Sequence, residues 1–128
     1  MSDLIFVYGA LRSGASNSWR MAEGRLVGAA QVAGTLVKVD WYPGLVLEGE
    51  TSVMGEVYEV GPELLGELDL FEGIGTDSRS GEYARVRAEV DCGGEVLSVW
   101  IYEWLKGVEG YEVVSSGDWL SVDLGGVF

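Results

Sequence analysis

The sequence predicts an α+β domain built on a curled sheet or small β-barrel with two short helices. Three observations predict this fold class: short strand-like segments recur along the chain, glycines interrupt several of them, and only two segments have helical features. Glycines inside strands often mark the bulges and bends that small barrels need in order to curl. Because 128 residues suffice for one domain with its own core, residues 1–128 are expected to fold as a single unit.

The first expected strand covers residues 4–8, a short apolar and aromatic run that ends at Gly9. A glycine lets the chain turn sharply and brings peptide N–H groups close to a ligand, and successive N–H groups of a turn bind anions. An ordinary loop after a first strand explains the same residues. The chain lacks the Gly-Lys-Ser/Thr ending of a phosphate-binding loop at this position.

Four further elements are expected before the second helix. Residues 16–25 are expected to form a short helix that polar residues cap, and residues 26–40 form a strand rich in valine, alanine and glycine. Residues 45–47 and 53–60 are expected to form two more strands. The polar connection 48–52 separates these two strands.

The second helix is expected over residues 63–72. Its apolar residues recur at the spacing of three and four that is typical of an amphipathic helix: Leu64, Leu65, Leu68 and Phe71. Gly73 and Gly75 follow and are expected to end the helix. Residues 74–82 are polar and contain glycine, which favours a loop.

Residues 83–90 and 95–104 are expected to form a β-hairpin. The first of these segments alternates between apolar and polar residues, and the Asp91-Cys92-Gly93-Gly94 sequence between them supplies glycines for positive φ angles. Both faces of the second strand are expected to be covered, because both carry large apolar or aromatic residues. The tail around Gly117-Asp118-Trp119 is expected to close the sheet or to pack over its end.

The charge of the chain excludes several classes of partner. Acidic residues outnumber basic ones by 21 to 8, which gives a formal net charge of −13. Phosphate backbones and anionic membrane surfaces repel such a protein, so neither nucleic acid nor a membrane is expected as a partner. Because no apolar run approaches the roughly 18 residues of a membrane helix and no segment resembles a signal peptide, we expect a cytoplasmic protein. The oligomeric state is not predicted.

The chain has no histidine and a single cysteine, Cys92. Ser-His-Asp and Cys-His catalytic systems need an imidazole, and zinc sites need histidines or clusters of cysteines. A catalyst made from this chain therefore has to use carboxylates, tyrosines, arginines or backbone groups, and neither a metal nor a cofactor is expected. Cys92 lies in the expected hairpin turn, and we interpret it as incidental.

Glu72 breaks the apolar pattern of the second helix. It follows Leu65 by seven residues and Leu68 by four, so it lies on the stripe of the leucines, where another apolar residue is expected. Burial predicts a raised pKa for this carboxyl group, and so does the helix dipole, which disfavours a negative charge in the last turn by about 0.3 to 1 kcal/mol. A raised pKa suits a general base near neutral pH. Alternatively, the helix ends before Glu72 and the carboxylate lies in water.

Other charged and aromatic residues allow two interpretations. Tyr83 and Arg85 share a strand face, and they either hold a substrate carboxylate or belong to an exposed, ion-paired face. We interpret Asp69 as a solvated helix residue and Arg12 as a solvent-exposed side chain. The five tryptophans are interpreted as core residues rather than as a ligand platform.

Five blocks of the sequence together resemble the γ-glutamylcyclotransferase-like (AIG2-like) family. They occur in the family's order and extend from about residue 4 to residue 104. The blocks are Phe6-Val7-Tyr8-Gly9-Ala10-Leu11-Arg12, Tyr42-Pro43-Gly44-Leu45, Gly55-Glu56-Val57-Tyr58-Glu59-Val60, Leu68-Asp69-Leu70-Phe71-Glu72-Gly73 and Tyr83-Ala84-Arg85. The closing residues 117–119 resemble the tail of the branch that includes γ-glutamyl-butirosin cyclotransferase.

This resemblance implies a mixed β-barrel, a small-molecule γ-glutamyl substrate and an intramolecular aminoacyl transfer. It implies that Glu72, the residue that breaks the helical stripe, is the general acid/base. The implied substrate-binding residues, which act through backbone N–H groups, are Tyr8, Gly9, Ala10 and Leu11. Many relatives carry a histidine in the first helix, and this chain has none.

The implied reaction needs few catalytic groups. The α-amino group of a γ-glutamyl compound attacks its own side-chain carbonyl, which closes the 5-oxoproline lactam and releases an amine without water, metal or an enzyme nucleophile. The protein has to hold the ring-closing conformer, move a proton and stabilise the oxyanion. The alternative is a non-catalytic small-molecule binding module of the same fold.

Overall fold

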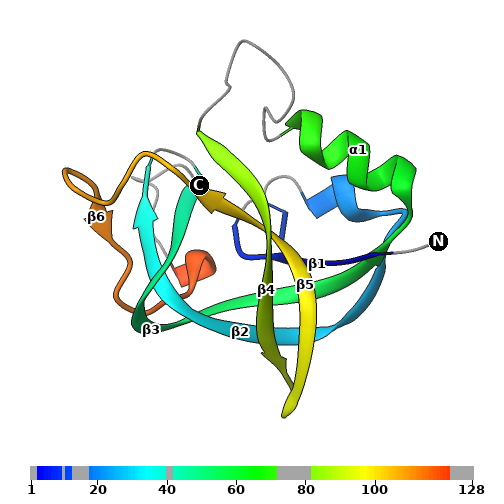
Figure 1. Ribbon diagram of the computed structural model, residues 1–128, viewed down its shortest axis with the longest axis horizontal. Coiled ribbons are helices and arrows are strands. Elements are labelled where there is room, and N and C mark those ends of the chain that lie inside the picture. The colour runs from blue at the N-terminus through cyan, green and yellow to red at the C-terminus, as the bar shows by residue number, and fades with distance from the viewer. Residues whose placement is uncertain (1–2, 10, 13–17, 40–41, 72–81, 122–128) are drawn as a thin grey trace.

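A six-stranded sheet forms most of the computed structural model, and one main helix lies against it (Figure 1). The structure describes residues 3–9, 11–12, 18–39, 42–71 and 82–121. The elements are β1 (Asp3–Val7), η1 (Ser18–Met21), β2 (Arg25–Lys38), β3 (Pro43–Val60), α1 (Pro62–Phe71), β4 (Tyr83–Cys92), β5 (Glu95–Trp104), β6 (Glu112–Val113) and η2 (Trp119–Ser121), where η marks a 3-10 helix.

The sheet is mixed, and its strands follow the order β3-β1-β5-β4-β2-β6, with an additional pairing between β3 and β2. The pairings therefore run from β3 through β1, β5, β4 and β2 and return to β3. β1 and β5 are parallel and meet at Ile5 and Trp100, whereas the other pairs are antiparallel. This arrangement confirms the α+β class that the sequence predicts.

The long β2–β3 pair differs from the prediction, because β3 is one strand where two were expected. The β2–β3 pairing continues on both sides of the polar connection, but its register breaks there: Gly34 pairs with Thr51, and the next residue, Thr35, pairs with Val46. The Thr35 hydroxyl donates a 2.7 Å hydrogen bond to the Glu48 carbonyl oxygen, and Gly49 adopts a φ of 124°. Residues 47–50 thus bulge out of the pairing without ending the strand.

Of the two helices that the sequence predicts, the structure confirms the second and shortens the first. Helix α1 begins at Pro62 and buries the three leucines of the predicted stripe, Leu64, Leu65 and Leu68. The expected helix over residues 16–25 is reduced, within its described part, to the 3-10 turn η1, because β2 already begins at Arg25. None of the described helices is long and apolar enough to cross a membrane.

The core consists of two hydrophobic clusters that share β5. The sheet cluster contains Val99 and Ile101 of β5 together with buried side chains such as Phe6 and Trp119. The helix cluster lies under α1 and η1, which are side by side in Figure 1, and its members include Leu11, Met21, Leu65, Leu68 and Tyr102. Both faces of β5 are therefore covered, as predicted.

The β4–β5 hairpin is also confirmed. Its strands pair from Tyr83 with Trp104 to Cys92 with Glu95. Gly93 and Gly94 adopt φ angles of 63° and 92°, a region that L side chains rarely occupy, and the Gly94 N–H donates a 2.8 Å hydrogen bond to Oδ1 of Asp91.

Candidate functional site

The predicted substrate loop follows β1 directly. The Arg12 N–H donates a 3.0 Å hydrogen bond to the Gly9 carbonyl oxygen and closes a turn over residues 9–12. Gly9 is buried, and a Cβ atom there would lie 2.6 Å from the Pro43 ring, so only glycine fits this close approach. Leu11 is buried in the helix cluster. Ala10 lies outside the described residues.

Tyr8 ties this loop to the middle of the sheet. Its side chain is buried in the sheet cluster, and its hydroxyl donates a hydrogen bond to the backbone carbonyl oxygen of Tyr102 in β5. The start of the loop is therefore fixed by side-chain packing as well as by the pairing of β1 with β3.

Tyr83 and Arg85 contact other parts of the protein and are only partly exposed. The Tyr83 hydroxyl donates a 2.6 Å hydrogen bond to the Pro43 carbonyl oxygen. Arg85 Nε lies 3.0 Å from Oδ1 of Asp69, and its guanidinium stacks over the Trp100 ring at 4.3 Å from the centroid. Their assignment to a substrate carboxylate stays a prediction.

The interpretation of Asp69 as a solvated residue is wrong. Its side chain is 19% exposed, and Oδ1 accepts a 2.7 Å hydrogen bond from the Tyr102 hydroxyl. Arg85 approaches the same oxygen from β4. The helix position alone allowed a solvated carboxylate, but β4 and β5 place two polar partners beside it.

The described residues just before the predicted catalytic residue, Glu72, are connected to the β1 loop through Tyr102 and the helix cluster. Asp69 of α1 binds the Tyr102 side chain, and the Tyr102 carbonyl binds Tyr8 at the start of the loop. Phe71, which immediately precedes Glu72, packs against the helix cluster that contains Leu11. Glu72 itself lies outside the described residues, so its role and its pKa stay predictions.

A buried ion-pair network is the main polar feature that the sequence interpretation missed. Arg12 was interpreted as solvent-exposed, but only 9% of it is exposed. Its Nε donates to Oε2 of Glu56 at 2.9 Å, and its Nη1 donates to Oδ1 of Asp118 at 2.6 Å. The sequence did not single out this network, because Glu56 and Glu59 both interrupt the segment from Val53 to Val60 and only Glu56 is buried.

Comparison with known proteins places the chain in a family. A family model described as gamma-glutamyl cyclotransferase, AIG2-like, matches residues 5–121. The chain belongs to this family. The match spans both the β1 loop and the segment that contains Glu72, and it confirms the resemblance read from the five sequence blocks.

Individual members of the family resemble the chain over nearly its whole length. The gamma-glutamylcyclotransferase family protein YtfP of Escherichia coli K12 is 38% identical over 120 residues, which cover 93% of this chain and 97% of YtfP. Gamma-L-glutamyl-butirosin B gamma-glutamyl cyclotransferase of Niallia circulans is 36% identical over 118 residues, which cover 90% of this chain and 74% of that protein. The chain is thus an enzyme of the cyclotransferase class.

Solved structures of relatives share the fold. The solution structure of Escherichia coli YtfP superposes with a TM-score of 0.66 at 36% identity and covers 92% of this chain and 96% of YtfP. The crystal structure of YkqA from Bacillus subtilis gives a TM-score of 0.75 at 29% identity, with 93% of this chain and 40% of YkqA covered.

Burial at the core of this cyclotransferase fold also changes the acidity of one tyrosine. Burial raises the pKa of the Tyr58 hydroxyl above its ordinary value, and the nearby negative charge of Glu56 raises it further. Tyr58 lies on β3 and belongs to the helix cluster. Its neutral form is therefore favoured in the folded protein.

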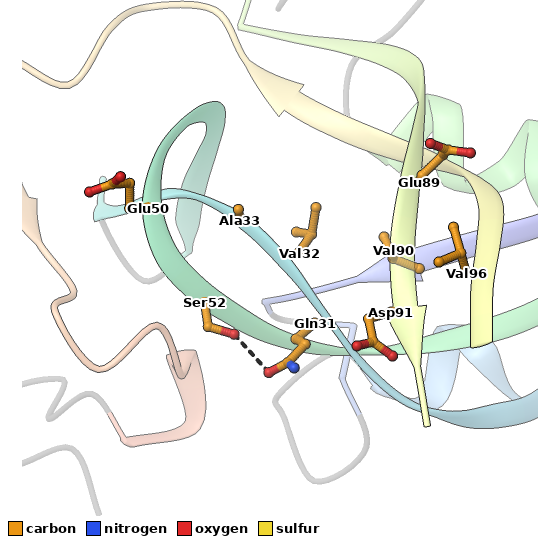
Figure 2. A pocket seen from close by; sticks show the side chains of 9 residues that line it. All are labelled: Gln31, Val32, Ala33, Glu50, Ser52, Glu89, Val90, Asp91 and Val96. Carbon is orange, nitrogen blue, oxygen red and sulfur yellow. Dashed lines mark hydrogen bonds between the residues drawn. The ribbon is translucent and has the colours of Figure 1, made fainter. Parts of the chain in front are cut away.

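Two pockets in the described part of the protein are not lined by Tyr8, Gly9, Leu11, Tyr83 or Arg85. A pocket of about 420 Å³ opens between β2, β3 and the β4–β5 hairpin, and Figure 2 shows carboxylates of Glu50, Glu89 and Asp91 on its walls. Gln31 and Ser52, also on its walls, are joined by a 2.7 Å hydrogen bond. Within the described ranges, no group of three or more acidic or cysteine side chains is placed to hold a metal ion.

The second pocket, of about 290 Å³, lies between η1 and α1. Trp19 on its rim is 63% exposed, so the interpretation of every tryptophan as a core residue is wrong for this one. Trp104 and Trp119 are buried as predicted. Arg20 stacks over both Trp19 and Phe71, at 4.3 and 4.1 Å from the ring centroids.

Proposed function

We propose that the chain converts a γ-glutamyl amine or γ-glutamyl amino acid into 5-oxoproline and the free amine. The observation that carries this proposal is the family match over residues 5–121, which spans the β1 loop and Glu72 together. The relatives support the reaction class, since one of them is named for acting on γ-glutamyl-butirosin.

In the proposed mechanism Glu72 performs both proton transfers. Its carboxylate takes a proton from the substrate α-ammonium group, and the freed amine attacks the γ-carbonyl carbon to form the C–N bond of the lactam. The C–N bond to the leaving group then breaks as Glu72 returns this proton to the departing nitrogen. The attacking nitrogen loses its second proton as it becomes the lactam N–H, and that proton leaves with the released amine as its ammonium ion. A positioned acid/base of this kind contributes about 10²- to 10⁴-fold in rate.

The Tyr8–Leu11 segment is the proposed binding loop for the γ-glutamyl group. Its peptide N–H groups hold substrate oxygens, and each N–H directed at the developing oxyanion contributes roughly 3 to 4 kcal/mol. The fixed attachment of Tyr8 and the tight packing of Gly9 support this role, because stabilisation of this kind needs donors that are already in place.

Tyr83 and Arg85 are proposed to line the same site. Both pack from β4 onto or beside the helix cluster, and Arg85 contacts Asp69 three residues before Glu72. In this proposal Arg85 supplies positive charge for a substrate carboxylate.

The proposal also covers the architecture of the sheet, the cell compartment and the class of partner. The ring of pairings from β3 through β1, β5, β4 and β2 is proposed to form a small mixed barrel that holds the loop and α1 in a fixed relation. A reducing cytoplasm is the proposed compartment, which agrees with the free thiol of Cys92. The net charge of −13 supports a small-molecule partner rather than nucleic acid.

The substitution Glu72→Gln tests the proposal. The wild type is incubated with γ-glutamyl amino acids, γ-glutamyl amines and γ-glutamylated antibiotics, and 5-oxoproline is measured. Glu72→Gln is expected to lower its release by at least about 10²-fold while the far-UV circular dichroism is unchanged. Glu67→Gln, at an exposed position of the same helix, is the matched control and is expected to keep full activity. Full turnover by Glu72→Gln would refute the assigned role.

A further inference from the structure

We infer that Arg12 is a positioning residue whose two ion pairs hold the turn of residues 9–12 in the shape that substrate binding needs. The inference rests on the proposed function, in which peptide N–H groups of this turn hold the γ-glutamyl group. Arg12 acts through the turn and not by touching the substrate.

Arg12 is both the last residue of the turn and its anchor. Its backbone N–H closes the turn on the Gly9 carbonyl oxygen at 3.0 Å. Its side chain points into the protein, where only 9% of the residue is exposed. A displacement of the guanidinium is therefore transmitted to the backbone that carries the Gly9 and Leu11 N–H groups.

The two carboxylates that bind Arg12 are themselves fixed to the sheet. Glu56 belongs to β3 and pairs with Val7, the residue that precedes Tyr8. Asp118 follows Gly117, whose carbonyl oxygen accepts a 2.7 Å hydrogen bond from the Met54 N–H of β3. Both ends of the loop are thus attached to the same stretch of β3. The start is attached through the pairing of β1 with β3, and the end through the Arg12 side chain.

The geometry requires an arginine rather than a cation in general. Nε and Nη1 reach two different carboxylates at 2.9 and 2.6 Å, which a planar guanidinium with several fixed donors can do. A lysine keeps the charge, but its ammonium is a compact point charge on a flexible stem. Arg12→Lys therefore preserves the local charge while loosening the turn.

The kinetics of Arg12→Lys test the inference. With a γ-glutamyl substrate that the wild type turns over, KM is expected to rise about 10- to 100-fold, because small misplacements in a binding site cost this much. The pH profile of kcat is expected to stay unchanged, because Glu72 is untouched. A merely structural role would reduce the folded fraction, which lowers kcat and leaves KM as it is. An unchanged KM would therefore overturn the inference.

Hydrogen exchange provides a readout that does not depend on activity. The amide of residue 12 is expected to exchange on the order of tenfold faster in Arg12→Lys, because the turn opens more often. Asp118→Asn, which removes one of the two ion pairs at a side chain that is 37% exposed, is expected to shift KM and exchange in the same direction. Asp118→Asn replaces Arg12→Lys in both measurements if Arg12→Lys does not fold. Unchanged exchange in the folded variant would overturn the inference.

Arg25→Lys is the matched control. Arg25 Nε binds Glu59 of the same strand β3 at 2.9 Å, but the Arg25 side chain is 69% exposed, so KM and the exchange of residue 12 are expected to match the wild type. If the wild type releases no 5-oxoproline from any substrate, the proposed function fails. The exchange comparison between Arg12→Lys and Arg25→Lys then still decides whether Arg12 holds the turn.

Discussion

Two ion pairs on strand β3 have the same length and different surroundings. Glu56 and Glu59 each accept a 2.9 Å hydrogen bond from an arginine Nε, Arg12 in one case and Arg25 in the other. The Arg12 side chain is 11% exposed and the Arg25 side chain is 69% exposed. The N–O distance is therefore a poor guide to the free-energy cost of removing one partner. Water can solvate the charge that remains at the exposed pair, but not the charge that remains at the buried pair.

The two pairs also differ in what they connect. Arg25 and Glu59 are register partners of β2 and β3, so the backbone already joins them. Arg12 joins the β1 loop to β3 and to the tail at Asp118, and side chains make both links. The comparison teaches that the buried pair adds a tertiary connection, whereas the exposed pair duplicates one.

Removing the buried cation is expected to have the largest effect. Arg12→Met fills a similar space but removes the positive charge that lies 2.9 Å from the buried Glu56 carboxylate, which is expected to cost about 3 to 5 kcal/mol of unfolding free energy. Urea unfolding followed by tryptophan fluorescence measures this loss. A loss below about 1 kcal/mol, the range of exposed pairs, would erase the contrast between the two sites.

Moving the tail is expected to cost less. Gly117 has a φ of 71°, and a Cβ atom there would lie 2.0 Å from the Ser52 carbonyl oxygen, so Gly117→Ala displaces the chain that carries Asp118. We expect a loss of about 1 to 3 kcal/mol by urea unfolding. Gly61→Ala, where no atom lies within 4 Å of the added Cβ, is the control. Equal stability of the two variants would contradict the tight seating of the tail.

Tyr58 extends the comparison to pH. Its folded-state pKa is raised, so its contribution to stability is fully present below the unfolded pKa and is lost as the pH rises through the folded pKa. The unfolded value is about 10, which places the loss above pH 10. Tyr58→Phe is expected to flatten the decline in unfolding free energy as the pH rises above about 10. An identical slope in wild type and variant would rule out this contribution.

The exposed pair is expected to show the smallest effect. Arg25→Ala removes the contact with Glu59 but leaves a solvated carboxylate, and exposed pairs are worth about 0.2 to 1 kcal/mol. The expected loss shrinks further in 0.5 M salt, because salt screens exposed charges. A loss comparable to that of Arg12→Met would show that burial does not govern the difference.

Local patterns predicted much of the fold. The β4–β5 hairpin follows from alternation and the Gly93-Gly94 pair, and α1 follows from the leucine spacing. The break in register around Gly49 was predicted as a connection between two strands, but pairing with β2 on both sides keeps β3 continuous. Local sequence identifies the irregular segment, whereas the partner strand decides whether it ends the element.

The polar contacts of the site were not predictable in the same way. Arg12 finds its partners 44 and 106 residues away, and Asp69 receives the hydroxyl of Tyr102 from 33 residues away. No periodic pattern in the sequence predicts such long-range contacts, because whether a charged side chain is buried depends on which distant strand or tail covers it. Local patterns singled out Gly9 and Glu72, and the family's motifs supplied their roles. The roles of the loop, Glu72, Tyr83 and Arg85 stay predictions.

The identity of the product in ¹⁸O-labelled water tests the central claim most directly. Ring closure by the substrate's own amine uses no water, so the account predicts unlabelled 5-oxoproline and free amine in equal amounts. Glutamate that carries ¹⁸O in its side-chain carboxylate, released in place of 5-oxoproline, would show hydrolysis and contradict the account.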